Sequence, residues 1–126
     1  MIPNGERGLV ATMQTQSVLY AIATWFAKGK QPSLELPSGW FGRPYDNLHV
    51  LTWSAATEHK VLVELDGQLL LVITDPGTVV ESETELIIKD CAQVVLDWQE
   101  YGSLKPHADN HGPGSVRFLA HGVTVR

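Results

Sequence analysis

The spacing of apolar residues changes along this 126-residue chain from a helical period to a β-strand period. Between residues 13 and 28, one helical face carries Val18, Leu19, Ile22 and Phe26. Thr12 or Thr15 can supply the N-cap oxygen, and Gly29 suits the left-handed residue that follows a helix. The pattern predicts an amphipathic helix over residues 13–28 that packs on the core, with docking on a partner as the alternative.

Downstream of residue 48 the apolar positions alternate, as they do in β-strands. The first strong strand, 60–65, points Val61, Val63 and Leu65 to one side, and the second, 68–74, points Leu69, Leu71 and Ile73 there. Asp66-Gly67 between them fits a two-residue type I′ turn. Leu70 and Val72 make the second face of the returning strand apolar as well. That face indicates a central strand covered on both sides, or one that lines a barrel.

Shorter β-rich runs occupy the rest of the chain. Strands are expected at residues 48–54, 78–80, 86–89, 92–101 and 115–121, with loops at 55–59 and 102–114. A helix is the alternative for residues 92–101, because their apolar positions also fit one helical face. Pro32 and Pro37 predict extended, non-helical chain between the helix and the first strand.

These elements predict an α+β fold with one N-terminal helix. The helix packs on a strongly bent, mainly antiparallel sheet, or on a partly open small barrel, of six to seven strands. The length predicts a single domain over residues 1–126. Within it we expect a flexible arm over residues 1–12, the helix over residues 13–28 and the antiparallel strands over residues 48–126.

Composition narrows the classes of partner and location. The net charge of −5 argues against a nucleic-acid surface or an anionic membrane surface, so neither is an expected partner. The longest apolar run, residues 69–73, is too short to span a bilayer. A single cysteine, Cys91, cannot form an intrachain disulfide, and the N-terminus shows no apolar run of signal-peptide length. We therefore expect a cytoplasmic protein, with Cys91 as a small buried apolar residue; a reactive thiol is the alternative.

An aromatic-rich loop at residues 40–49 is the first candidate site. Either Trp40 and Phe41 plug one end of the core, or the loop forms an exposed aromatic lip that binds a ligand. The candidate ligand-binding residues are Trp40, Arg43, Tyr45, Asp46, His49 and Tyr101. Among them Asp46 could orient His49 as a general base while Arg43 holds an anion, or Arg43 and Asp46 could lock the loop.

The second candidate is a set of potential metal ligands within residues 102–114. In an extended chain His107, Asp109 and His111 project to the same side, and two imidazoles with a carboxylate could hold Zn²⁺ or Fe²⁺. The alternative is a solvated loop with two surface histidines. The sequence contains no P-loop, no dinucleotide-binding glycine pattern, no H-E-x-x-H and no G-x-S-x-G.

Two segments of the chain resemble a known group of proteins. Residues 40–49 read W-F-G-R-P-Y-D-N-L-H, and residues 97–102 read D-W-Q-E-Y-G. The chain resembles small uncharacterised bacterial proteins with a W-x-G-R-P-x-D-N-x-H opening and a later aromatic segment ending in Tyr-Gly. In those proteins an Arg-Pro pair follows that segment, whereas here residues 103–106 read S-L-K-P. The resemblance covers residues 40–102. It implies that the two segments belong to one unit, and it implies no catalytic residue.

We therefore expect a small cytoplasmic bacterial domain that binds a protein or a small molecule without catalysis and without a cofactor, as a monomer or a homodimer. The alternative is a small metal-binding protein or a hydrolase-type enzyme. Such an enzyme would use His107, Asp109 and His111, or else Arg43, Asp46 and His49.

Overall fold

The helix of this protein lies where the sequence predicts it. The computed structural model describes residues 12–41, 48–99 and 105–120. Helix α1 (Met13–Ala27) begins after Thr12, whose hydroxyl accepts a hydrogen bond from the backbone N–H of Thr15. The Thr15 hydroxyl in turn accepts one from the backbone N–H of Thr12, so the two residues form a capping box. Gly29 follows the helix with a φ of 88°. Within the described residues no helix is both long and apolar enough to cross a membrane.

The strands form two five-stranded sheets in which every neighbouring pair is antiparallel. One sheet, here called the β5 sheet, has the order β3-β4-β5-β8-β9. Its strands are β3 (Leu51–Ala56), β4 (Lys60–Leu65), β5 (Leu69–Thr74), β8 (Gln93–Gln99) and β9 (Pro106–Asn110). The other, the β1 sheet, has the order β2-β1-β10-β7-β6. Its strands are β1 (Pro32–Leu36), β2 (Gly39–Phe41), β6 (Val79–Glu81), β7 (Glu85–Cys91) and β10 (Gly114–Ala120).

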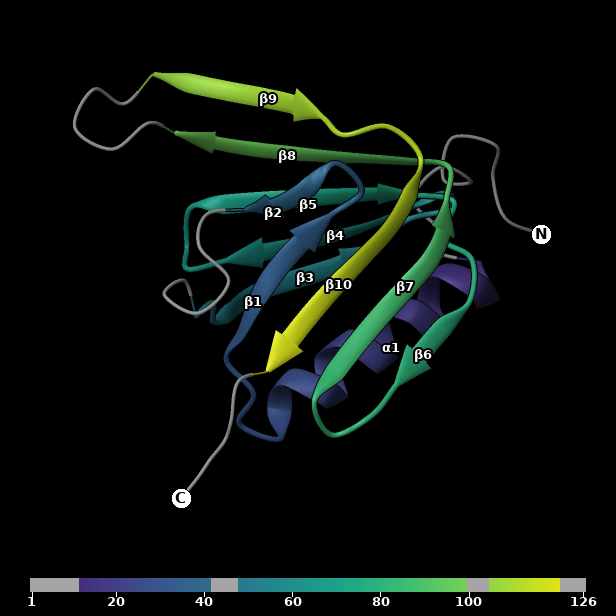
Figure 1. Cartoon of the computed structure of the whole chain (residues 1–126). Coiled ribbons are helices and arrows are strands. Elements are labelled where there is room, and N and C mark those ends of the chain that lie inside the picture. Colours follow the sequence, from purple (N-terminus) through teal and green to yellow (C-terminus); the bar gives the residue numbers. More distant parts are fainter. Residues whose placement is uncertain (1–11, 42–47, 100–104, 121–126) are drawn as a thin grey trace.

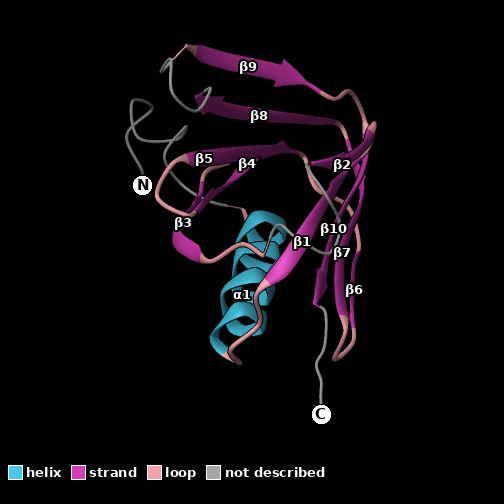
Figure 2. Cartoon of the chain, turned by 60° about the vertical axis from the view of Figure 1, so that its left-hand side comes forward, coloured by secondary structure: helices cyan, strands magenta, loops and turns pink. Residues whose placement is uncertain are grey.

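Helix α1 lies in the angle between the two sheets, whose strands run in steeply different directions (Figures 1 and 2). Its side chains Val18, Ile22 and Trp25 are fully buried, so the apolar stripe of the helix packs on the core of this chain. Phe26 on the helix also belongs to the core, and the sheets supply the rest: Leu34, Leu36, Val61, Val63, Leu65, Leu69, Leu71, Ile73, Leu86, Ile88, Cys91, Val94, Leu96, Val116 and Phe118. Helix and sheets therefore share one hydrophobic core.

The chain passes from the β1 sheet to the β5 sheet at a tight corner between β7 and β8. Only Ala92 separates the two strands, and Asp90, the second-last residue of β7, has a φ of 58°. Gly77 packs against this corner so closely that an added Cβ would lie 2.5 Å from the carbonyl oxygen of Lys89. Glycine is therefore required at position 77 for the corner to form.

The α+β prediction is confirmed, but the described chain has ten strands in place of six to seven, and the sheets do not close into a barrel there. Three strands lie where the sequence predicts a linker or a loop: β1, β2 and β9. Strands β1 and β9 begin at Pro32 and Pro106, at a position where a missing N–H is tolerated. The prediction is wrong for β1 because this strand depends on a partner distant in sequence, β10. It is wrong for β9 because the mostly polar residues of this strand give no alternating pattern.

The predicted hairpin is confirmed, but its loop has three residues, 66–68, in place of two, because Leu65 pairs with Leu69. Asp66 and Gly67 both have positive φ, 58° and 70°, and the N–H of Gln68 donates to the carbonyl of Leu65 at 3.1 Å. Strand β8 occupies most of residues 92–101, so the helix alternative for that segment is wrong. Strand β5 is the central strand of its sheet, as one of the two alternatives for its second apolar face predicts. Its outward residues Leu70 and Val72 are half-buried.

Candidate functional site

Four rings form a continuous series from one sheet to the other. Phe41 on β2 lies with its ring centroid 6.0 Å from that of Trp98 on β8, edge to face. On one side of this pair, the ring of His49 lies 6.0 Å from Phe41. On the other side, His107 on β9 stacks on Trp98 at 4.3 Å, with the planes 13° apart. Phe41 packs against the core, as the plug prediction requires, and joins the two sheets, whereas Trp40, the other residue of the predicted plug, is not among the core residues.

His49 is held by the hairpin turn between β4 and β5. Its Nδ1 lies 2.6 Å from Oδ2 of Asp66, and the other carboxylate oxygen of Asp66 accepts from the Val50 N–H at 2.9 Å. The Asp66 N–H donates to the Val50 carbonyl, and the His49 N–H donates to the Pro32 carbonyl, both at 2.8 Å. In the described chain the carboxylate that orients His49 is therefore that of Asp66. The sequence predicts Asp66 only as a residue of the hairpin turn.

The second ring nitrogen of His49 has no hydrogen-bond partner in the described chain. The residue is 5% exposed, and its Nε2 is shielded from solvent. An imidazole fixed at Nδ1 by a carboxylate and free at Nε2 has the arrangement of a general base or of a metal ligand. Burial of a free ring nitrogen costs on the order of 1–3 kcal/mol, so the fold retains it against a penalty.

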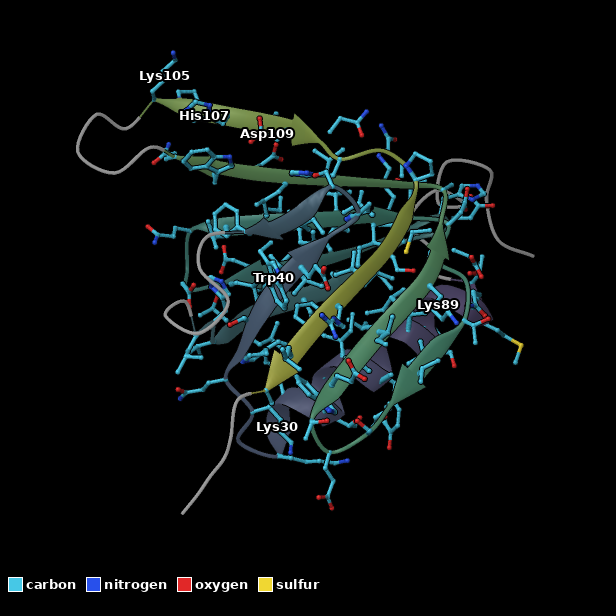
Figure 3. The ribbon with its side chains drawn as sticks, in the orientation of Figure 1. Lys30, Trp40, Lys89, Lys105, His107 and Asp109 are labelled. Carbon is cyan, nitrogen blue, oxygen red and sulfur yellow. The ribbon has the colours of Figure 1, made fainter. Side chains whose placement is uncertain are left out.

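The three predicted metal ligands make separate contacts. His107 stacks on Trp98, while Asp109 accepts a hydrogen bond from the Trp98 Nε1–H at 2.7 Å. His111 lies beyond the end of β9, where its Nδ1 is 2.5 Å from the hydroxyl oxygen of Ser38. Figure 3 shows His107 and Asp109 side by side along β9. Within the described residues, no three His, Cys, Asp or Glu side chains converge as a metal site would need.

Trp40 lies on the other side of β2 from Phe41, over the outer face of the β1 sheet and away from His107 and Asp109 (Figure 3). There it covers the guanidinium of Arg117, 5.2 Å from the ring centroid. Arg117 also binds Glu35 at 2.8 Å and Glu85 at 3.1 Å. Burial lowers the pKa of Arg117, but the hydrogen bonds to Glu85 and Glu35 outweigh it and leave the pKa above its ordinary value. The two carboxylates already pair with the Arg117 guanidinium. Trp40, Arg117, Glu35 and Glu85 therefore form a cluster with a structural role.

The remaining ligand-binding candidates lie outside the described residues: Arg43, Tyr45, Asp46 and Tyr101. The same holds for most of the predicted arm, residues 1–11, and for residues 121–126. Of the predicted site residues, the structure therefore connects His49 and His107, through Phe41 and Trp98. It separates both from Trp40.

A hollow of about 630 Å³ lies on the outer face of the β5 sheet, beside the hairpin turn. We call it the outer hollow. Its lining residues with outward side chains are Glu64 on β4, Leu70 on β5, Asp97 and Gln99 on β8, and Pro106 and Ala108 on β9. The turn residues Gly67 and Gln68 close one end, and Leu69, Trp98 and His107 also contribute.

The strand register gives the outer hollow a definite order. Glu64 pairs with Leu70, Leu70 with Asp97, and Asp97 with Ala108, so these four residues form one row across four strands. The described lining therefore places an apolar floor between two carboxylates and carries no Lys or Arg. Sequence reasoning missed this site, because the hollow depends on β9. The one available signal was the apolar second face of β5.

Comparisons of the chain with family models, with curated proteins and with solved structures found no match.

Proposed function

We propose that this protein is a non-enzymatic binding module and that the outer hollow is its ligand site. The observation that carries the proposal is the hollow itself. Its volume of about 630 Å³ lies within the range of small-ligand sites, roughly 300–1,000 Å³. Leu70, Pro106 and Ala108 provide apolar surface, while Glu64 and Asp97 provide polar groups that can fix orientation. This combination of apolar floor and few polar groups is typical of ligand sites.

The surface around the outer hollow supports the same proposal. Trp53 on β3 pairs with Glu64, so it shares the outer face, and it is 51% exposed. Leu62, Val72 and Val95 lie on this face in the next rows and are half-buried. A connected apolar surface of this kind, left open to solvent by the described chain, is typical of interaction sites.

A neutral apolar dye tests the proposal. Nile red fluorescence should increase on binding, and Leu70→Gln should weaken that binding by about tenfold, because a polar group replaces the apolar floor. The matched control is Val80→Gln, which changes an apolar residue of the β1 sheet that is 43% exposed. Equal binding by both variants and the unaltered protein would contradict the proposal.

A second copy of the chain is another possible occupant of this face. Sedimentation velocity distinguishes it, because a dimer that Leu70→Gln converts to a monomer would place the homodimer contact at the outer hollow. A dimer that persists in Leu70→Gln would place that contact elsewhere.

One observation favours a second candidate function, a hydrolase-type activity. His49 is oriented by Asp66 at 2.6 Å, and its Nε2 makes no hydrogen bond in the described chain. Because that nitrogen is buried, an ester would reach it as a general base only after the surrounding side chains move. The test is release of p-nitrophenol from p-nitrophenyl acetate, compared between the unaltered protein and His49→Gln. A rate above that of free imidazole which His49→Gln removes would support catalysis, and equal rates would exclude it for such esters.

A further inference from the structure

We propose that the outer hollow recognises an extended peptide segment that carries a lysine or arginine, and that the segment adds as a strand to the free edge of β9. This inference rests on the proposed function, since it names the ligand class of the same site. Strand β9 is the last strand of the β5 sheet, and in both views no described element lies beyond it (Figures 1 and 2).

The hydrogen bonds between β8 and β9 show which backbone groups that edge presents. Val94 donates to the carbonyl of Gly112 at 3.0 Å and accepts from the N–H of His111 at 2.8 Å. Hydrogen-bonded pairs alternate along an antiparallel ladder, so by register the next two are Leu96 with Asp109 and Trp98 with His107. The N–H and C=O groups of Ala108 and Asn110 therefore point away from β8, toward the free edge.

Pro106 fixes where an added strand can pair. It also points away from β8 in this alternation, and it has no N–H to offer. The donors on the free edge of β9 are thus the N–H groups of Ala108 and Asn110. An added strand would pair over this short section, which lies beside the outer hollow, and Pro106 would stop the pairing from extending toward residue 105.

The charge of the outer hollow selects the side chain. The residue of an added strand that faces Ala108 continues the row Glu64, Leu70, Asp97 and Ala108. Asp97 is two strands away from it, at about 10 Å. A Lys or Arg side chain extended along the row covers most of that separation, and the methyl group of Ala108 leaves its path open. Its aliphatic stem would lie on Ala108, and its charge would meet Asp97.

Charge complementarity therefore favours a basic segment over a neutral or acidic one. The described lining of the hollow has two carboxylates and no Lys or Arg, and the whole chain has a net charge of −5. An acidic side chain in the same place would meet like charges at Asp97 and then Glu64. Main-chain hydrogen bonds to β9 would supply the sequence-independent part of the binding.

The test uses three blocked pentapeptides, Thr-Val-Xaa-Val-Thr, in which Xaa is Lys, Gln or Glu. Binding to the full chain is measured by NMR titration. We expect the Lys peptide to bind about fivefold more tightly than the Gln peptide at low salt, and the Glu peptide to bind most weakly. Asp97→Asn should remove the preference for Lys over Gln, whereas Glu85→Gln on the β1 sheet should leave it unchanged.

Ala108→Pro tests the added strand itself. It removes an N–H that β8 does not use, at an edge that already tolerates Pro106, so the thermal midpoint should change little while binding of all three peptides is lost. Equal affinities for the Lys, Gln and Glu peptides would overturn the charge selection. Peptide binding that survives Ala108→Pro would overturn strand addition. Nile red binding that responds to Leu70→Gln would show that the proposed function holds even where this inference fails.

Discussion

At the scale of single residues, Asp66 has two structural roles, and the sequence predicts only the first of them. Its positive φ of 58° forms the hairpin turn, as the Asp-Gly pair predicts. Its carboxylate also holds His49 and the Val50 N–H, which ties the segment before β3 to the turn. The second role could not be predicted, because nothing in the spacing of positions 49 and 66 indicates that they meet.

Asp66→Ala should therefore destabilise the protein by about 2–3 kcal/mol, because it removes two hydrogen bonds and leaves His49 buried without a partner. Asp75→Ala is the matched control. Asp75 also has a positive φ, 45°, and also contacts a histidine, but His59 is exposed. Urea unfolding measures both variants, and equal losses would show that the effect comes from the turn alone.

Cys91 gives a pH dependence of stability. Burial raises the pKa of its thiol from 9.0 to about 11, a backbone hydrogen bond from Gly77 lowers it in part, and the charge of Asp90 raises it further. The folded thiol therefore keeps its proton at a pH where the unfolded thiol loses it. The contribution to stability is complete below about pH 9 and is lost as the pH rises toward 11.

We expect the free energy of unfolding to fall between pH 9 and 11 by on the order of 2 kcal/mol more in the unaltered protein than in Cys91→Ala. Urea unfolding across that pH range measures the difference. Parallel pH profiles for the two proteins would contradict the raised pKa. Native Cys91 should also react slowly with thiol reagents at neutral pH, since the thiolate is the reactive form.

At the scale of elements, the predictable strands are those whose apolar residues alternate. Val61, Val63 and Leu65 indicate β4, and the matching run in β5 makes the hairpin unmistakable. Strand β9 reads P-H-A-D-N and has no large apolar residue, so its pairing with β8 gives no signal in its own residues. The outer hollow was missed for the same reason, because β9 forms one of its walls.

Hydrogen exchange tests the placement of β9. The N–H groups of His107 and Asp109 point toward β8, so they should exchange more slowly than those of Ala108 and Asn110, which point to the free edge. Amide exchange followed by NMR measures all four. Uniformly fast exchange would show that β9 does not pair with β8 in solution, and would remove one wall of the outer hollow.

At the scale of the whole molecule, Phe41 and Trp98 join the two sheets outside the helix-lined part of the core. Trp98 also binds Asp109 and stacks on His107, so it fixes β9 as well. The same side chain thereby supports both the junction of the two sheets and a wall of the outer hollow.

Trp98→Leu should destabilise the protein by about 2–3 kcal/mol, because it removes ring contacts and the hydrogen bond to Asp109. Trp53→Leu makes the same change at a residue that is 51% exposed, and should cost less than about 0.5 kcal/mol. Thermal unfolding compares the two variants. A smaller loss for Trp98→Leu than for Trp53→Leu would contradict the joining role of Trp98.

The claim that the outer hollow is the binding site is tested most directly by mapping amide chemical shifts during a titration with the Lys pentapeptide. We predict that the shifts concentrate at Glu64, Leu70, Asp97 and Ala108. Shifts centred instead on Trp40 and Arg117, with none at the outer hollow, would contradict it.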